Sequence, residues 1–413
     1  MSAAETLVES RYAWARLAAA LALMTIGGSG MYAITVVLPR VQADFGVGRS
    51  DASLPYTFTM IGFGLGGILM GRLSDRFGVI VPVIIGALGL CAGFVAAGSA
   101  GDLWQFNLAQ GLLIGLLGTS ATFAPLVADI SLWFTRRRGI AVAICISGNY
   151  LAGTIWPPLM QHFIDSAGWR QTYIGMGVFC LVAMLPLALA LRRRPPIPAQ
   201  FASGPAAGSV ASVAGSAGKL GLAPGTLLTL LCVAGVACCV AMSMPQVHIV
   251  AYCGDLGYGP ARGAQMLSVM LGCGIVSRLT FGWISDHIGG LRTLLLGSTL
   301  QCIALFLFLP FTGLVSLYLV SAMFGLFQGG IVPAYALIVR EHFTPHEAGA
   351  RVGTVLMATL FGMALGGWMS GAIFDLTGSY RAAFVNGIAW NLVNIAIVAA
   401  LLYRSRARAA FAG

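Results

Sequence analysis

A single arginine, Arg278, stands well inside an apolar stretch of the sequence, residues 261–284. Burying an arginine in hydrocarbon costs at least about 2.5–3.5 kcal/mol on insertion scales, so this side chain must meet water, an anion or a buried partner. Gly274 and Gly282, one turn away on either side, leave space along the face that carries the guanidinium. Its planar fork of donors fits a carboxylate, so we predict a carboxylate-binding residue. The alternatives are a side chain that reaches the nearer interface, or an ion pair with Asp129.

Other polar side chains interrupt the apolar stretches and could donate a hydrogen bond to a carboxylate or a hydroxyl group. These candidates carry phenol or amide groups: Tyr32, Asn149, Tyr150, Gln328 and Tyr335. Each could instead satisfy a hydrogen bond between helices. His248, near the end of another apolar stretch, is the candidate for proton exchange near neutral pH, with a plain interfacial histidine as the alternative.

One motif occurs twice: GRLSDRFG at residues 71–78 returns as GWISDHIG at 282–289, an offset of 211 residues. Arg170 and Arg381 match at the same offset, so the two halves of the chain resemble each other. Glycines permit a tight turn, and we expect Asp75 to lie at the start of a helix, where amide donors favour a carboxylate.

The elements that must position these residues are membrane-spanning helices. The chain has 413 residues, of which 58% are hydrophobic and 9% charged, against about 25% charged residues in a soluble domain. The apolar residues come in blocks of roughly 20, the length that crosses hydrocarbon. We predict an all-α membrane protein with twelve spans, at 14–38, 51–71, 79–100, 104–130, 139–163, 170–191, 225–250, 261–284, 291–311, 314–339, 350–373 and 382–403.

The basic residues orient these spans. With both termini inside, the inner loops and ends hold 17 of the 23 basic residues and the outer loops hold five. This asymmetry predicts cytoplasmic termini and explains the net charge of +10 by contact with lipid, without nucleic acid. A segment rich in Gly, Ala, Ser and Pro divides the chain. The predicted domains are a six-helix bundle at 1–191, a cytoplasmic linker at 192–224 and a second six-helix bundle at 225–413.

At these motifs the chain resembles the major facilitator superfamily, and within it the monocarboxylate transporters and their bacterial relatives. The likeness covers most of both halves, in particular residues 133–170 and 362–384. It implies two pseudo-symmetric six-helix bundles that rock about a central site. It also implies that Gly71, Asp75, Arg76, Gly78 and Asp286 of the repeated motif form a conformational gate. The helices that carry the five phenol and amide candidates line the cavity of that superfamily, and the family's substrate-binding arginine falls on Arg278.

The chain departs from that family at two places beside the predicted site. Many members have an aspartate four residues before the arginine, where this chain has Gly274. Animal members have a lysine in the first helix, where Tyr32 falls here. Related oxalate/formate exchangers have a second cation in the eleventh helix, whereas residues 352–373 contain none.

The resemblance therefore favours a secondary transporter of small monocarboxylates such as lactate or pyruvate, working by alternating access and coupled to protons, in the cell inner membrane. The alternatives are an organic-anion exchanger of the oxalate/formate type, a drug or hydrophobic-compound exporter, or a transporter-like receptor. No ATP-binding motif, nucleophile–base pair or metal-ligand cluster stands out in the sequence, so we expect neither an enzyme nor a cofactor or metal. The expected partners are the carboxylate, protons and membrane lipid.

Overall fold

The computed structural model describes residues 9–134, 137–193 and 222–411, and every regular element in these ranges is a helix. Twelve segments are long and apolar enough to cross a membrane, and each overlaps one of the twelve predicted spans. The predicted all-α membrane fold is therefore confirmed. The predicted linker, 192–224, lies mostly outside the described residues.

Before the linker, the spans are built from α1 to α8 with two short non-α pieces, the π-helical η1 and the 3-10 turn η2. Their bounds are α1 Arg11–Gly27, α2 Ser29–Phe45, α3 Arg49–Phe77, α4 Ile80–Gly98, α5 Leu103–Leu108, η1 Ala109–Gly118, η2 Thr119–Thr122, α6 Ala124–Trp133, α7 Arg138–Ala167 and α8 Trp169–Ala190.

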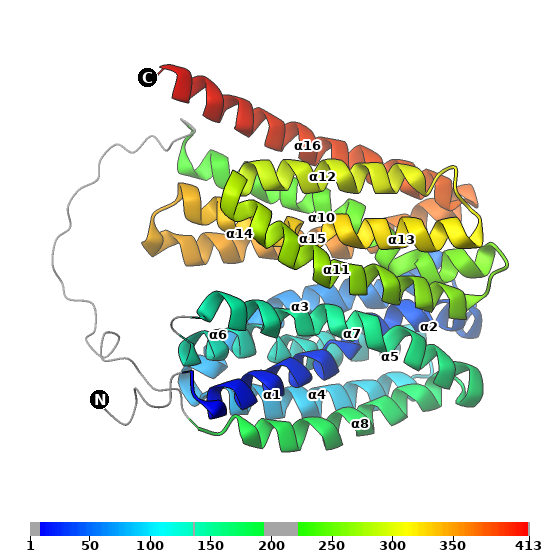
Figure 1. The fold of residues 1–413 in the computed structure, drawn as a ribbon. Coiled ribbons are helices and arrows are strands. Elements are labelled where there is room, and N and C mark those ends of the chain that lie inside the picture. Colours follow the sequence, from blue (N-terminus) through cyan, green and yellow to red (C-terminus); the bar gives the residue numbers. More distant parts are fainter. Residues whose placement is uncertain (1–8, 135–136, 194–221, 412–413) are drawn as a thin grey trace.

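After the linker, seven helices form the remaining six spans. They are α10 Pro224–Asp255, α11 Pro260–Ile288, α12 Gly290–Leu307, α13 Leu314–Gln328, α14 Ile331–His342, α15 Pro345–Thr377 and α16 Tyr380–Phe411. In Figure 1 these helices lie above the set α1–α8, and α1 begins at the same end of the molecule at which α16 ends. An even number of crossings requires that arrangement. We call this the inner end and the opposite one the outer end, after the predicted topology.

The two sets of helices meet chiefly along two pairs, α3 with α15 and α7 with α11, and α2 also contacts α10 and α11. The Thr57 hydroxyl of α3 donates to the Ala364 carbonyl of α15 at 2.9 Å, and Ser268 of α11 donates to the Thr154 carbonyl of α7. Small residues bring these helices close, as expected where packing in lipid has no hydrophobic driving force. The candidate residues of α7 and α11 consequently lie at the junction of the two sets.

Two spans break at paired glycines. Gly28 separates α1 from α2, and Gly329 with Gly330 separates α13 from α14. A Cβ on Gly28 would lie 2.6 Å from Ala152 Cβ, and one on Gly329 would lie 2.5 Å from the Gly274 carbonyl oxygen. The close approach requires glycine, and the breaks fall within four residues of Tyr32 and next to Gln328.

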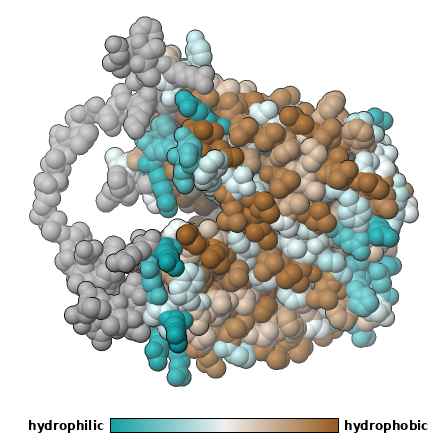
Figure 2. Space-filling view, viewed as in Figure 1, coloured by the Kyte–Doolittle hydropathy of each residue, from teal (hydrophilic) through white to brown (hydrophobic). Residues whose placement is uncertain are grey.

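The surface carries the pattern expected of a membrane protein. Figure 2 shows a broad hydrophobic band across the middle of the molecule, with hydrophilic residues gathered toward its two ends. Large apolar side chains are exposed on many helices, among them Leu65, Leu88, Leu112, Val182 and Leu319. A soluble monomer rarely exposes so continuous an apolar surface, so this band faces lipid.

The repeated motif has a different local structure from the one predicted for Asp75. The helix α3 continues through Asp75 and ends only at Phe77, so this aspartate lies in the last turn of the second span and not at the start of the third. The reason is the position of the turn residue: Gly78 has φ of +85° and closes the helix through its N–H bond to the Ser74 carbonyl at 2.8 Å. The exposed Asp75 therefore cannot cap the third span.

The second copy of the motif folds in the same way. Asp286 lies in the last turn of α11, and Gly289, with φ of +80°, donates its N–H to the Ser285 carbonyl at 2.9 Å. The internal repeat of the sequence is thus also a repeat of backbone geometry.

Candidate functional site

Arg278 lies on α11 at the junction of the two sets, where it is half-buried. Its guanidinium carbon stands 4.5 Å from the ring centroid of Tyr150 on α7, so the tyrosine offers its aromatic face instead of the predicted hydroxyl. Arg278 Nε is buried and has no hydrogen-bond partner. The ion pairs among the described residues are formed by other arginines, Arg16, Arg40, Arg49, Arg170 and Arg351. The arginine therefore presents a cation that no carboxylate of this part of the chain neutralises.

Two further candidates lie beside this pair. The Tyr32 hydroxyl, on α2, donates to Asn149 Oδ1 on α7 at 2.9 Å. A Cβ on Gly153 would meet both the Tyr32 ring, at 2.8 Å, and the Leu271 side chain of α11. The structure thus brings Tyr32, Asn149, Tyr150 and Arg278 together from three helices, and we call these four residues the arginine cluster.

Gln328 and Tyr335 have other partners. Gln328, fully buried at the end of α13, accepts a hydrogen bond from Gln246 Nε2 of α10 at 2.8 Å, while its own Nε2 has no partner. The Tyr335 hydroxyl donates to Asn394 Oδ1 at 2.9 Å, and Asn394 Nδ2 donates to Ser298 Oγ at 2.7 Å. These bonds join α14, α16 and α12 within the second set of helices. They are the interhelical hydrogen bonds that the sequence left open as the alternative for Tyr335.

His248 is fully buried on α10. Its Nδ1 lies 3.0 Å from the Tyr380 hydroxyl and its Nε2 lies 2.8 Å from the Gly367 carbonyl oxygen. Since the carbonyl can only accept, Nε2 carries the proton and Nδ1 is free to accept from Tyr380. This histidine joins α10 to α15 and α16 and is enclosed by protein.

The outer end carries a charged junction that the sequence analysis missed, and we call it the outer clamp. Arg49, at the start of α3, donates from Nη1 and Nη2 to both carboxylate oxygens of Asp255 at 3.2 Å, and from Nη1 to the Tyr380 hydroxyl at 2.7 Å. Asp375 accepts from the backbone N–H groups of Arg49 and Ser50, at 2.7 Å each. Arg49 belongs to the first set of helices, and all three of these partners belong to the second set. The available signal was three outer arginines in the first half, Arg49 among them, and the outer aspartates Asp255 and Asp375 in the second half.

A second missed residue is Arg16, at the inner end of α1. It forms a bidentate ion pair with Asp129 of α6, at 2.7 and 2.8 Å, and its guanidinium stands 4.7 Å from the Trp133 ring centroid. Both side chains are buried, with relative exposures of 0% and 4%. The alternative pairing of Arg278 with Asp129 is therefore wrong, because Arg16, which lies inside the first span, already holds that carboxylate.

The predicted gate residues lie at the inner end, where α3 and α11 end. Asp75, Arg76 and Asp286 are exposed. A Cβ on Gly71 would meet nothing within 4 Å, and the same holds for Gly353 of α15, the partner of α3. At the outer end of the same helix pair, a Cβ on Gly371 would lie 2.7 Å from the Arg49 carbonyl oxygen. The contact between α3 and α15 is thus tight at the outer end and open at the inner end.

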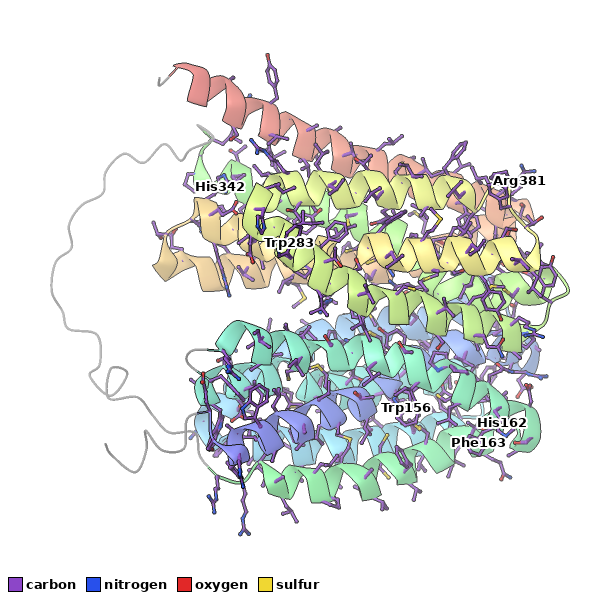
Figure 3. The ribbon with its side chains drawn as sticks, viewed as in Figure 1. Trp156, His162, Phe163, Trp283, His342 and Arg381 are labelled. Carbon is purple, nitrogen blue, oxygen red and sulfur yellow. The ribbon has the colours of Figure 1, made fainter. Side chains whose placement is uncertain are left out.

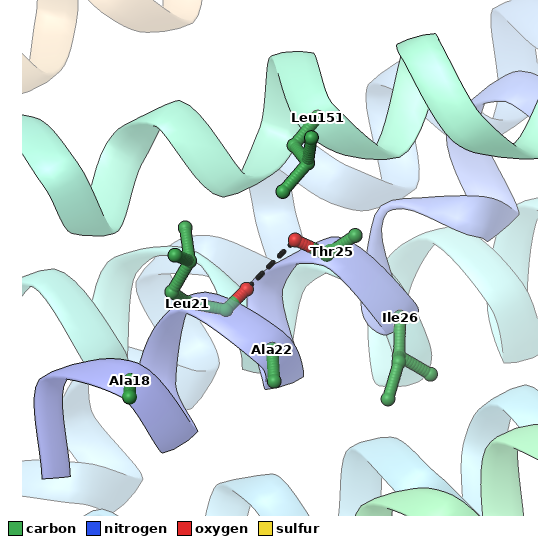
Figure 4. Close-up of a pocket in the computed structure, with 6 residues that line it drawn as sticks. All are labelled: Ala18, Leu21, Ala22, Thr25, Ile26 and Leu151. Carbon is green, nitrogen blue, oxygen red and sulfur yellow. Dashed lines mark hydrogen bonds between the residues drawn. The ribbon is translucent and has the colours of Figure 1, made fainter. Parts of the chain in front are cut away.

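A groove of about 330 Å³ lies between α1 and α7 and is lined by Ala18, Leu21, Ala22, Thr25, Ile26 and Leu151 (Figure 4). Its one hydroxyl, on Thr25, donates to the Leu21 carbonyl at 2.8 Å. The groove offers a carboxylate neither a cation nor a free donor, so it is not the predicted site.

Figure 3 shows how far apart the two ends of the molecule are, with Arg381 and His162 at the outer end and His342 at the inner end.

The chain matches the family model described as Major Facilitator Superfamily over residues 18–314 and 230–412. It is 31% identical to monocarboxylate transporter 13 of Bos taurus over 328 residues, 76% of this chain and 71% of that protein. It is 24% identical to the agnestins efflux protein AgnL12 of Paecilomyces divaricatus over 335 residues, 81% of this chain and 74% of that protein.

Among solved structures, a bacterial homologue of the human lysosomal transporter Spinster, in an inward-facing and unoccupied conformation, has the same fold. The TM-score is 0.68 at 15% identity, with 96% of each chain covered. Fold, family model and curated relatives agree: the chain belongs to the major facilitator superfamily of membrane transporters, in its monocarboxylate-transporter-like group.

Proposed function

We propose that this transporter carries small monocarboxylates of the lactate and pyruvate kind across the cell inner membrane, by alternating access of one central site to the two sides. The observation that carries this proposal is the unneutralised guanidinium of Arg278, held at the junction of the two sets of helices. A small organic acid offers it the planar, negatively charged oxygens that a guanidinium fork binds best. The curated relative named for monocarboxylate transport supports the same substrate class.

The charge of the site favours a monoanion over a dianion. The arginine cluster contains one arginine, Arg278, and its other members are two neutral phenols and an amide. A second carboxylate of the substrate would have no cation to meet among the described residues of the cluster. We therefore rank the oxalate/formate type of exchanger below a monocarboxylate transporter.

Alternating access is supported by the asymmetry between the two ends. The outer clamp joins the two sets through Arg49, whereas α3 and α15 separate around Gly71 and Gly353 at the inner end. This arrangement corresponds to a state that opens inward, with both termini on the cytoplasmic side as the basic residues predict. Release of the clamp would open the outer end.

Proton symport is the proposed mode of coupling, with His248 and Tyr380 as the proton-exchanging pair. Tyr380 bonds both His248 and Arg49, so a change in protonation of the histidine would reach the outer clamp through one shared hydroxyl. In this proposal the proton is not exchanged at Arg278. It is exchanged at His248 and Tyr380, during the conformational step that opens the outer end.

A second candidate function is the export of drugs or hydrophobic compounds, and the name of the fungal relative, an efflux protein, favours export. Sites for cationic compounds rely on acidic side chains inside the membrane. The acid that the sequence offers within a span, Asp129, is bound by Arg16. The exporter therefore ranks second.

An uptake assay in proteoliposomes tests these proposals together. The purified protein is supplied with radiolabelled pyruvate, lactate, formate, oxalate and benzoate, with and without an imposed pH gradient. We expect uptake of the small monocarboxylates, increased when the outside is acidic. Equal uptake with and without the pH gradient would rule out proton symport. The absence of uptake of every acid would contradict the substrate class.

A further inference from the structure

The contact between Arg278 and Tyr150 joins the two sets of helices. Tyr150 lies with its ring face 4.5 Å from the guanidinium carbon, and the two residues come from helices on opposite sides of the junction, α7 and α11. An arginine above an aromatic face is attracted by the negative charge of the ring's π-system. Unlike an ion pair, this attraction leaves the N–H donors at the guanidinium edge available.

Gly274 makes room for this ring. It lies one turn before Arg278 on α11, and a Cβ at this position would overlap Cε1 of the Tyr150 ring. An aromatic ring has no flexible end that could move aside, so any larger side chain at residue 274 must displace it. The absence of a side chain there is therefore what allows the ring to lie along α11 and reach Arg278.

We propose that Tyr150 is the positioning residue for Arg278: its ring, seated against Gly274, fixes the guanidinium without neutralising it, so that the site receives its substrate as the anion. The proposal rests on the proposed function, because it assumes that Arg278 binds a carboxylate. It deepens that function by assigning Tyr150 a role through its ring face and not through its hydroxyl. It also assigns a role to Gly274, which the substrate does not need to touch.

A consequence concerns pH. A guanidinium stays protonated at every physiological pH, so this site needs no proton before it can bind an anion. The titratable groups of the arginine cluster are the phenols of Tyr150 on α7, whose ring covers the guanidinium, and of Tyr32 on α2, which bonds the neighbouring Asn149. On α10 and α13, the neutral amides Gln246 and Gln328 bond each other, and His248 of α10 is bonded to Tyr380 and Gly367. The binding step should accordingly be independent of pH, whatever the pH dependence of transport.

The test measures the dissociation constant of pyruvate for detergent-purified protein between about pH 6 and pH 8, in a range where pyruvate and a guanidinium are both ionised. Tyr150→Phe keeps the ring and removes the hydroxyl, and we expect wild-type affinity. Tyr150→Leu removes the ring and should weaken binding roughly two- to thirtyfold, the range of a cation–π contact. Gly274→Ala should weaken binding in the same direction, because it displaces the ring.

Two controls separate positioning from folding. Tyr318→Leu removes a partly buried ring on α13 that bonds Gln265 at the outer end, and it should leave pyruvate affinity unchanged. The melting temperature of each variant reports whether the fold survives. A loss of affinity in Tyr150→Leu with rescue by Tyr150→Phe, at matched melting temperatures, is a result that a purely structural role would not give.

The outcomes distinguish this inference from the proposed function. If Arg278→Ala abolishes pyruvate binding while Tyr150→Leu and Tyr150→Phe both bind like wild type, the positioning role is wrong and the substrate class stands. If Tyr150→Phe loses as much affinity as Tyr150→Leu, the hydroxyl acts and the ring does not. Wild-type affinity that changes more than about threefold over this pH range would overturn the claim that the site binds without a proton. A wild-type protein that binds no monocarboxylate would overturn both proposals.

Discussion

At the scale of single residues, the molecule uses three of its buried or half-buried arginines in different ways. Arg16 is neutralised by Asp129 in a buried, bidentate ion pair, and Arg49 joins the two sets of helices through Asp255. All three guanidinium groups lie over aromatic rings, but Arg278 is the one of these three that forms no ion pair with a carboxylate of the described residues. A cation whose charge is already satisfied cannot bind a substrate anion, so the contrast singles out Arg278 as the substrate residue.

The pair of Arg16 and Asp129 should be structural. Asp129→Asn leaves a buried arginine without its counter-charge, and breaking a buried pair from one side costs about 3–5 kcal/mol. The expected result is a strongly lowered melting temperature in detergent. Replacing both partners at once, Arg16→Met with Asp129→Leu, should recover much of the loss because no charge remains buried. A double variant less stable than Asp129→Asn would show that the charges act in some other way.

Sequence reasoning predicted Arg278 because a lone cation in an apolar stretch is costly whatever surrounds it. It could not predict which face of Tyr150 meets the arginine, since that depends on how α7 and α11 are rotated against each other. It also counted Arg49 as an ordinary loop residue, because its partners lie 206 and 326 residues further along the chain. Contacts of that separation are set by the packing of the two sets and not by any local pattern.

At the scale of the elements, glycines decide where helices approach each other. The sequence offers a run of them in α3, at residues 62, 64, 66, 67 and 71, and treats them alike. The structure separates them. A Cβ on Gly66 would overlap the Leu116 carbonyl oxygen of η1 and lie 2.5 Å from Ser120 Oγ, whereas one on Gly67 would meet nothing within 4 Å. Adjacent glycines in one helix thus serve different purposes.

This difference gives a matched pair of substitutions. Gly66→Ala forces α3 and η1 apart, because the nearest atom is backbone, and should cost about 1–3 kcal/mol. Gly67→Ala adds a methyl group in open space and should be neutral, or stabilising by up to about 1 kcal/mol through its helix propensity. Melting temperatures of the two variants provide the comparison. Equal effects would mean that the packing of α3 on η1 is not as tight as described.

The element boundaries also show what the sequence could not determine. The turn between the second and third spans is as short as GRLSDRFG suggests, but its position depends on where the helix ends. Gly78, with its positive φ, terminates α3, so Asp75 remains helical. A motif that contains both a potential cap and a potential stop does not reveal which of the two the chain uses.

At the scale of the whole molecule, the composition was sufficient for the fold. Twelve blocks of roughly hydrocarbon length leave few alternatives, and the repeat at an offset of 211 residues predicted two related halves. What composition could not provide is how the halves meet. The contact is tight at the outer end, through Arg49, Asp255, Asp375 and Tyr380, and open at the inner end.

Removal of the outer clamp should shift the population toward outward-open states. Arg49→Ala removes the charged bonds to Asp255 and the bond to Tyr380, each charge-assisted bond being worth about 1.5–3 kcal/mol. Spin labels at the exposed outer residues Ser166 and Arg262, in a background with reactive cysteines replaced, report the distance between the two sets. We expect a longer distance in Arg49→Ala than in the parent. An unchanged distance distribution would show that the clamp does not hold the outer end closed.

The central claim is that Arg278 binds the substrate carboxylate. The affinity of the purified Arg278→Ala variant for pyruvate tests it most directly. Loss of a charge-assisted hydrogen bond of about 1.5–3 kcal/mol predicts binding weakened by roughly ten- to a hundredfold or more, with the melting temperature largely kept. Arg278→Lys should recover little, since a point charge does not reproduce the planar fork. Near-wild-type affinity in Arg278→Ala would contradict the account.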